Sequence, residues 1–508
     1  MDAAAVSPRR PIADLGHFEA NLIRMTDPHE TIASSRAEPR CRPWLAAAGA
    51  VMLVAALVWP WVLSGRDTFT QKSYDHDLFH LPLVRSFAAQ WPGVDLSDYP
   101  SATGPGFHLA LATLAQIFGT GETTLQFLGS LMAIGLVATV AWRFARWRGS
   151  ALEGLLLTLP LCLSPYLLGN AIWLMTDNLS LWLLAVAILG ASLTAATPAR
   201  LVRWSIAAAA ACFVRQINLW VLAPLVVAGW IASRSGTGLG EGAPAEVSGA
   251  GSRRHSAAAS TKSATGRTLG GFGMLAWTAL ACIPAVLVVG GFAWLWGGLT
   301  PPSFQEFHAV SVQPAAIPYG LTLFGVYGCP LWLTIFVTRG ERGVVPRSIV
   351  VLASFGWAAF LIAGNSDAGL EVGRNGGWLW RLVAATPSPT GVSIVLAFGS
   401  AVGVALLVQL AALAAGRRRL GGAIAAMAAL AAFLVAHAAN RQLFERYFDP
   451  PVLLFLALFA ALAWPRNDER RPDHPSPASG AFTVALAAMA AMQLAFATAT
   501  LFLPLLRN

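Results

Sequence analysis

Apolar stretches of about 20 residues, the length that crosses a bilayer as a helix, recur along the whole chain. Hydrophobic residues fill these stretches continuously and do not alternate with polar ones. This pattern predicts membrane-spanning helices and not the strands of a barrel. The predicted spans are 44–64, 123–142, 151–168, 177–197, 272–297, 316–338, 346–364, 391–414, 420–437, 448–464 and 481–503.

The composition supports a membrane protein. Hydrophobic residues make up 56% of the 508 residues and charged residues 12%, with a mean hydropathy of +0.60. A soluble chain carries about 25% charged residues. The first 43 residues are polar and contain six Arg, which is too long a lead for a cleavable signal peptide. We therefore expect an all-α polytopic membrane protein.

The net charge of +9 does not indicate nucleic-acid binding. Only two of the 34 basic residues are Lys, so we attribute the Arg-rich and Ala-rich composition to a GC-rich genome. The five Cys are dispersed and form no CxxC motif, which gives no sign of a zinc site or a disulfide framework. The sequence contains no cluster of acidic residues that requires a metal ion, although it allows a loosely held divalent ion. No cofactor is predicted.

The stretch 204–233 is too long for one span, and Arg215-Gln216-Ile217-Asn218 interrupts it. Arg and Lys favour cytoplasmic loops. The basic segments alternate correctly around the spans only if 204–233 crosses twice, as a hairpin whose Arg215 turn faces outward. This predicts 13 transmembrane helices, with the N-terminus inside and the C-terminus outside. The expected location is a bacterial inner (plasma) membrane.

The spans divide the chain into four segments. A polar cytoplasmic tail covers 1–43, and a first transmembrane module, expected to be catalytic, covers 44–233 with the large outer loop 65–122. Residues 234–271 are rich in Gly, Ser, Ala and Arg and are predicted to be a flexible cytoplasmic linker. Residues 272–508 form a second transmembrane module.

Polar residues gather on the predicted outer side. The segment SYDHDLFHLP places Asp75, His76, Asp77 and His80 shortly after the first apolar span. Ionisable groups near a membrane are costly and usually functional, although a single loop carboxylate is more often only solvated. The stretch 104–118 follows, apolar but short for a span, and we expect it to form a helix lying at the outer interface.

This arrangement resembles the GT-C glycosyltransferases, membrane enzymes that use polyprenyl-phosphate sugars. The shared features are an acidic motif in a large first outer loop, a proline-rich turn, an interfacial helix ending in Phe118-Gly119, and the element Glu445-Arg446-Tyr447-Phe448-Asp449-Pro450. The resemblance implies a GT-C-like bundle whose first outer loop carries short interfacial helices. It also implies an active site on the extracytoplasmic side.

Within that superfamily the chain is most similar to the dolichyl-phosphate-glucose-dependent alpha-1,2-glucosyltransferases of N-glycan precursor assembly. The family's Asp-Glu-x-Phe-His motif corresponds to His76-Asp77-Leu78-Phe79-His80, and its Thr-Asp to Thr176-Asp177. Its Phe-Arg-Gln-Thr-Asn corresponds to Val214-Arg215-Gln216-Ile217-Asn218. The resemblance implies transfer of a hexose, possibly glucose, from a polyprenyl-phosphate donor to a lipid-linked oligosaccharide or another extracytoplasmic acceptor.

Two departures from the family pattern leave the sugar and the acceptor open. His76 stands where the family has its first acid, with Asp75 one residue earlier. The family also has two separate motifs where Asn440-Arg441 and Arg446-Tyr447 here share one short loop.

The expected reaction is a single inverting displacement, which needs one carboxylate to take the proton of the acceptor hydroxyl. The family pattern and the position favour Asp77 as this base, with Asp75 as the reserve. His80 would share a face with Asp77 on a helical turn, where it could orient the base or contact phosphate, and a purely structural hydrogen bond is the other interpretation.

Guanidinium groups bind phosphate oxygens bidentately, which makes Arg446 the preferred donor clamp and Arg215, Arg441 and Arg381 further candidates. Asp177 begins a span and has a second interpretation, a helix cap together with Thr176. The remaining substrate-binding candidates are Gln216, Asn218 and Tyr447.

Two other classes of protein remain open, a transporter or flippase of lipid-linked sugars and a non-catalytic assembly subunit. A transporter should show internal repeats and charged or broken helices near the bilayer midplane. We find no repeat, and only the Arg215 hairpin fits a transporter. A non-catalytic subunit has no reason to keep clustered acids and imidazoles. The expected partners are the sugar donor, the glycan acceptor and membrane lipids, and not nucleic acid.

Overall fold

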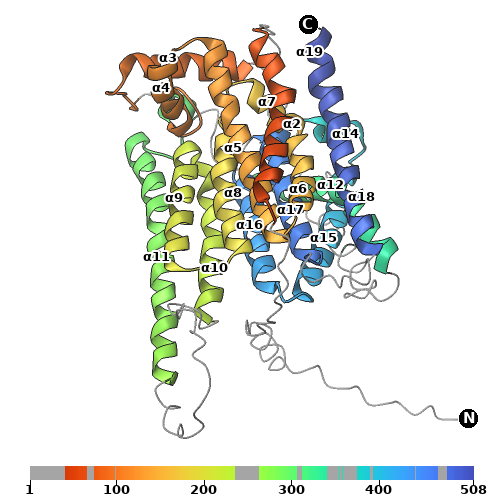
Figure 1. The fold of residues 1–508 in the computed structure, drawn as a ribbon. Helices are drawn as coiled ribbons and strands as arrows, with labels where there is room; N and C mark the ends of the chain where they lie inside the picture. The colour runs from red at the N-terminus through yellow and green to blue at the C-terminus, as the bar shows by residue number, and fades with distance from the viewer. Residues whose placement is uncertain are drawn as a thin grey trace, which may run out of the picture.

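Long helices run side by side through the computed structural model, with their apolar faces in contact (Figure 1). The structure describes residues 41–65, 74–97, 99–234, 263–305, 312–339, 354, 357, 375–388, 393–440, 442–466 and 477–507. Nine helices in this part of the chain are long and apolar enough to cross a bilayer, so the protein is an all-α polytopic membrane protein. The long helices are α2 (Pro43–Leu63), α5 (Glu122–Arg148), α6 (Ala151–Cys162), α8 (Asp177–Leu193), α9 (Pro198–Val214), α10 (Leu222–Arg234), α11 (Ser263–Trp296), α12 (Ala316–Arg339), α15 (Ile394–Ala415), α16 (Leu420–Ala438), α17 (Asp449–Ala463) and α18 (Pro477–Ala497).

Each predicted span in the described part of the chain corresponds to helix. α6 and α7 (Pro165–Ile172) form a bent pair that gives a tenth crossing if counted as one span. α8 and α9 have 17 residues each and are short for a full crossing by length alone. The predicted span 346–364 lies outside the described residues apart from two positions. The total of 13 therefore stays a prediction.

The predicted span 151–168 is helical but sharply bent. The chain bends by 72° between α6 and α7. Pro165 occupies the first turn of α7, and a residue before proline is pushed away from helical backbone angles. Ser164 instead caps α7, its hydroxyl accepting the Leu167 N–H at 3.2 Å. The apolar pattern continues through the bend, which is why hydropathy alone did not reveal it.

The expected break in 204–233 is confirmed as a break between helices. α9 ends at Val214, Arg215 is extended, and the short 3-10 helix η2 (Gln216–Val221) leads into α10. A second boundary differs from the prediction. α11 begins at Ser263, inside the segment 234–271 that was predicted to be linker, because a helix can continue past the end of its apolar stretch.

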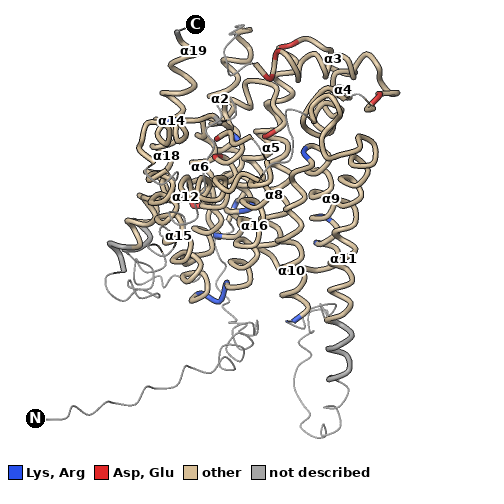
Figure 2. Tube along the Cα trace, turned by 180° about the vertical axis from the view of Figure 1, so that it is seen from behind, with Lys and Arg blue, Asp and Glu red and all other residues tan. Residues whose placement is uncertain are grey.

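One end of the bundle carries the outer-loop helices. There the π-helical turn η1 (His76–His80) leads into α3 (Leu81–Gln90), and α4 (Gly106–Phe118) lies across the direction of α5 and α9 (Figure 1). α4 confirms the helix expected at 104–118, and its Phe107, Leu111 and Ala115 pack in one buried cluster with residues of α3 and α5. Acidic segments gather at this end, and basic segments mark the opposite end below α10 and α15 (Figure 2).

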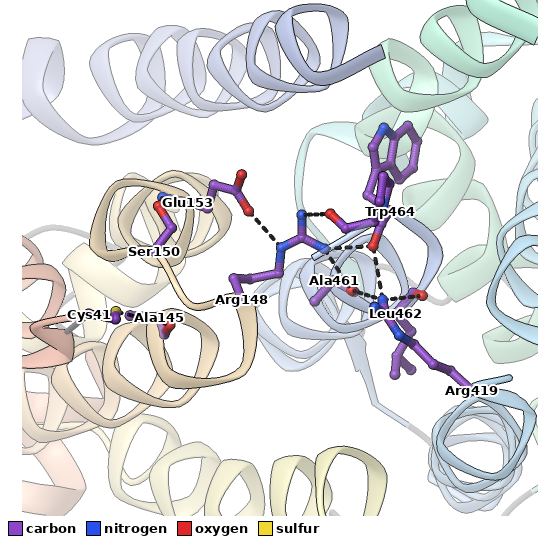
Figure 3. A network of polar contacts seen from close by, with 10 residues as sticks. Cys41, Ala145, Arg148, Ser150, Glu153, Arg419, Ala461, Leu462 and Trp464 are labelled. Atoms are coloured by element: carbon purple, nitrogen blue, oxygen red, sulfur yellow. Dashed lines mark hydrogen bonds and ion pairs between the residues drawn. The ribbon is translucent and has the colours of Figure 1, made fainter. Parts of the chain in front are cut away.

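The opposite end is tied together by two buried arginines (Figure 3). Arg148, at the end of α5, bonds to the carboxylate of Glu153 at 2.7 Å and to the Trp464 carbonyl at 2.6 Å. Arg419 bonds to the carbonyls of Leu462 and Trp464 at 3.0 and 2.9 Å. The last carbonyls of a helix lack partners within it and carry partial negative charge. Both guanidiniums therefore stabilise the C-terminal end of α17.

α17 runs through the centre of the bundle. In its span from Glu445 to Ala463, 83% of the residues are buried, as expected for a helix that is apolar all round. A parallel pair of two-residue strands precedes it, β1 (Asn375–Gly376) with β2 (Leu443–Phe444), which the sequence did not predict. α17 runs from the arginine cluster of Figure 3 to the outer-loop end of the bundle. There the turn that precedes α17 places Arg446 against Asp75, the residue before η1.

Candidate functional site

The motif SYDHDLFHLP forms a wide helical turn. The Leu81 N–H bonds to the His76 carbonyl five residues back, which makes η1 a π turn. Pro82, in the first turn of α3, has no N–H to give to the preceding turn, and this favours the irregularity. Asp75 and Asp77 are two residues apart, so their side chains leave this turn in different directions.

Asp75 points to the start of α17. Its carboxylate forms an ion pair with the Arg446 guanidinium at 2.5 Å. Arg446 also donates to the Tyr447 hydroxyl at 3.0 Å. Arg446 and Tyr447 come from η4 (Glu445–Tyr447), the 3-10 turn that leads into α17. The site therefore draws on both halves of the chain, across the two modules that were predicted as separate.

A second ion pair lies beside the first. Arg215, at the break between α9 and η2, bonds to Asp177 at the start of α8. The Arg215 guanidinium also stands 4.5 Å from the centre of the Tyr447 ring, and that of Arg446 stands 5.0 Å from it. Tyr447 thus contacts both guanidiniums. The Asp177 carboxylate is engaged in the ion pair with Arg215, and the Thr176 side chain forms no capping hydrogen bond at the start of α8. The interpretation of Asp177 and Thr176 as a helix cap is therefore not supported.

A small cavity of about 40 Å³ opens between these groups. That volume holds a few water molecules at about 10–15 Å³ each, and no sugar. Two buried N–H groups on lining residues have no hydrogen-bond partner, Nε of Arg446 and Nε1 of Trp220. Donors left unpaired beside two guanidiniums suit an anion. The polar lining residues are Asp177, Asn178, Ser180, Arg215, Asn218, Trp220, His437, Arg446 and Tyr447.

Asp77 lies in a separate cluster. Its carboxylate is 3.7 Å from Nε2 of His76, which is also 3.4 Å from Glu122. One ligand atom of each of these three residues lies within 4.8 Å of the others, a spacing that a metal ion could use. However, Nδ1 of His76 accepts the Leu174 N–H at 3.1 Å, which leaves the neutral ring with its proton on Nε2. A metal-bound imidazole needs the opposite arrangement, so this cluster does not fit a metal ion.

His80 belongs to a buried chain of polar groups. Its Nδ1 lies 2.8 Å from Nε2 of His108, and Nδ1 of His108 lies 2.7 Å from the Tyr99 hydroxyl. Burial lowers the pKa of His80 to about 4 and that of His108 well below its usual range. Both imidazoles are therefore neutral near pH 7. Neither Tyr99 nor His108 was singled out in the sequence, because their contact with His80 is long-range.

The remaining predicted substrate-binding residues are Gln216, Asn218 and Arg441. The Gln216 amide donates to the carbonyls of Ala102 and Leu299 at 3.3 and 2.7 Å, which ties the outer loop to the end of α11. The Asn218 amide donates to the Ser180 hydroxyl at 2.8 Å and lines the cavity. Arg441 lies outside the described residues.

The sequence analysis missed a pair of buried acids, Glu445 and Asp449, which are both 0% exposed. Asp449 accepts from the hydroxyls of Ser164 and Tyr327. Glu445 accepts from the Tyr319 hydroxyl and the Leu379 N–H, each at 3.1 Å. Their spacing of four residues before an apolar run was the available signal, since it places both on one face of the helix start.

Comparison with known proteins adds little. No protein-family model matches the chain, and no curated protein sequence matches it. Among solved structures the chain is similar to ArnT from Cupriavidus metallidurans in the apo state, at 16% identity and a TM-score of 0.31. The match covers 88% of this chain and 78% of that chain. A TM-score this low carries no conclusion about fold or function, which have to follow from the residues described above.

Proposed function

We propose that the protein is a membrane glycosyltransferase of the GT-C type, with its active site at the cavity beside Asp75 and Arg446. It transfers a sugar from a polyprenyl-phosphate donor to a lipid-linked glycan or another extracytoplasmic acceptor. The observation that carries this proposal is the pairing of two guanidiniums with two carboxylates around unpaired N–H donors at the outer-loop end of the bundle. Hexose transfer, with glucose as the first sugar to test, rests on the family resemblance alone.

The two arginines suit the donor phosphate. A polyprenyl-phosphate sugar carries one negative charge, and the leaving polyprenyl phosphate gains a second when the bond to the anomeric carbon breaks. Guanidiniums placed at that phosphate stabilise the second charge as it develops. The cavity is too small for the donor, so donor binding must widen it, and we infer that the phosphate does so by breaking the ion pair between Arg446 and Asp75. The phosphate then takes the place of the Asp75 carboxylate on Arg446.

The same exchange of partners on Arg446 makes Asp75 available as the general base. Once phosphate binds Arg446, the Asp75 carboxylate is released next to the anomeric carbon. It takes the proton of the acceptor hydroxyl while the acceptor oxygen bonds to that carbon from the face opposite the phosphate, which gives inversion. Asp75 stands one residue before the position of the first acid in the family motif. A π turn holds one residue more than an α-helical turn, which compensates for this difference. Asp77, the base expected from the motif, faces His76 and Glu122 and is the alternative.

A transporter or flippase of lipid-linked sugars is the second candidate. The bent pair α6 and α7 and the buried acids Glu445 and Asp449 are features that transporters share. In this protein, however, Ser164 at the start of α7 already bonds to Asp449. The positive end of the broken helix is thus occupied by the protein's own carboxylate, and not by an open substrate site.

The two functions separate in one experiment. Purified protein in liposomes is given a synthetic polyprenyl-phosphate glucose and a lipid-linked glycan acceptor, and both glycan transfer and donor flipping are measured. A parallel assay in detergent removes the bilayer that separates two sides. The glycosyltransferase proposal expects glycan transfer there as well, and it expects Arg446→Ala to abolish this transfer. Donor flipping in liposomes without any transfer would instead establish the transporter.

A further inference from the structure

We propose that His80 presents an unprotonated Nε2 to a hydroxyl group of the substrate, and that His108 and Tyr99 are positioning residues that hold it in this tautomer. This inference rests on the proposed glycosyltransferase function and names a further contact in the same site. It also rules out phosphate contact by His80, because an acceptor nitrogen cannot donate to phosphate.

The three side chains form one continuous, buried hydrogen-bonded chain, and only His80 keeps a small exposed surface. Tyr99 and His108 are 0% exposed and His80 is 7% exposed. The Tyr99 hydroxyl bonds to the Gly104 carbonyl at 3.1 Å as well as to His108 at 2.7 Å. A buried polar group that loses its partner costs free energy, so all three bonds are expected to form together.

The Gly104 carbonyl fixes the direction of the chain, because a carbonyl oxygen can only accept. Tyr99 must give its single proton to Gly104, so the Tyr99 oxygen accepts from Nδ1 of His108. The neutral His108 then has no proton on Nε2, which accepts from Nδ1 of His80. Nε2 of His80 is left with a lone pair. The reverse direction would leave Gly104 without its bond.

The position of Gly104 is itself fixed by packing. A Cβ atom at this residue would lie 2.3 Å from the Phe213 carbonyl oxygen at the end of α9, so only glycine allows this approach. The carbonyl that sets the direction is therefore held against a long helix of the bundle. The packing of the turn Gly104-Pro105-Gly106 therefore helps to determine the tautomer of His80.

His80 lies near the proposed base and the donor arginine, because the charges of Asp75 and Arg446 both act on its ring. It follows Asp75 by five residues, one π turn, which places the two side chains on the same side of η1. The charged groups close enough to affect its protonation are Asp75, Asp177, Arg446 and His76, all from the two clusters described above. Nε2 of His80 has no hydrogen-bond partner in the described part of the chain. A hydroxyl of the acceptor or of the sugar can supply one.

The first test measures the tautomer directly. Protein labelled with ¹⁵N-histidine in lipid bilayers is studied by solid-state NMR at pH 7, with the His80 signals assigned from their loss in His80→Gln. We expect a proton on Nδ1 and none on Nε2. A proton on Nε2 would overturn the proposal. This readout needs no substrate, so it stands apart from any failure of the glycosyltransferase assignment.

The second test links the tautomer to catalysis. Tyr99→Phe removes the group that accepts from His108, so the chain can reverse and Nε2 of His80 gains a proton. We expect kcat to fall about tenfold, the value of one hydrogen bond, with the donor KM unchanged. Tyr74→Phe, at an exposed tyrosine on the same end of the molecule, is the matched control and should keep full activity. A reversed tautomer with unchanged kcat would overturn the substrate contact.

Discussion

Asp75 and Arg446 form an ion pair across the two halves of the chain, with 2.5 Å between their charged atoms. Their side chains are 27% and 24% exposed, so the pair is held in place by the bundle yet open to a ligand. In the proposed mechanism this contact couples two events, because the phosphate that binds Arg446 is also what releases Asp75. Each of the following predictions tests a part of that arrangement or of the frame that holds it.

Arg446→Lys should weaken donor binding by about tenfold or more, because an ammonium lacks the planar fork that holds two phosphate oxygens. The measurement is the affinity of the purified variant for a non-transferable donor analogue. Arg85→Lys is the control, since Arg85 is an exposed arginine on the same end of the molecule. Unchanged donor affinity in Arg446→Ala would move the clamp to Arg215 or Arg441.

Trp220→Phe should destabilise the unliganded protein only by the packing that the smaller ring loses against Phe433 and Phe455, and should also reduce the stabilisation by donor. The indole N–H has no partner in the described protein, so its removal breaks no internal hydrogen bond, and Trp220 is one of the residues that line the cavity beside the guanidiniums. At a fixed concentration, a ligand stabilises the folded protein by an amount that grows with the logarithm of its affinity, which a thermal melt with and without donor analogue measures. An equal donor-induced rise in both proteins would show that the indole does not contact the donor.

Arg148→Met should destabilise the protein without changing the chemistry of the site. Arg148 is 0% exposed and bonds to three carbonyls at the end of α17 as well as to Glu153, so its loss leaves buried groups unpaired. We expect a cost of about 3 kcal/mol in the free energy of unfolding, seen as a lower melting temperature. Arg146→Met, at an exposed position two residues earlier in α5, should change little. Equal melting temperatures for the two variants would contradict this role of Arg148.

The folded protein should lose stability on acidification through the titration of His80. The unfolded chain binds this proton near pKa 6.5 and the folded protein only near 4, so the contribution is complete above pH 6.5 and is lost as the pH falls toward 4. The shift corresponds to about 3 kcal/mol. His108 acts in the same direction. In melts between pH 7 and pH 4.5, His80→Gln should show a weaker pH dependence than the wild type, and an equal dependence would refute the assignment.

The sequence predicts the helical frame well because apolar length and basic loops are local signals. The hairpin at Arg215 followed from charge, and the helix at 104–118 followed from its length. The bend between α6 and α7 escaped because Ser164 and Pro165 sit inside an unbroken apolar run. Hydropathy measures the environment of a segment and not its direction, so a bend within the bundle leaves no trace in it.

The site was harder to predict. Arg215, Arg446, Tyr447 and Asp177 were named and do meet, since each belongs to a motif with a sequence signature. The choice between Asp75 and Asp77 depends on a π turn, which sequence spacing does not show. The chain from Tyr99 through His108 to His80 depends on contacts between the loop and α4, and no local pattern encodes them.

The direct test of the central claim is the transfer rate of purified Asp75→Asn and Asp77→Asn with a synthetic polyprenyl-phosphate sugar and a lipid-linked acceptor. Asn keeps the size and shape of Asp and removes only its ability to take a proton. General-base assistance is worth about 10²–10⁴ in rate. We predict a loss of that size in Asp75→Asn with donor binding retained, and a much smaller effect in Asp77→Asn. Full activity in Asp75→Asn with an inactive Asp77→Asn would assign the base to Asp77, and full activity in both would remove this turn from the catalytic site.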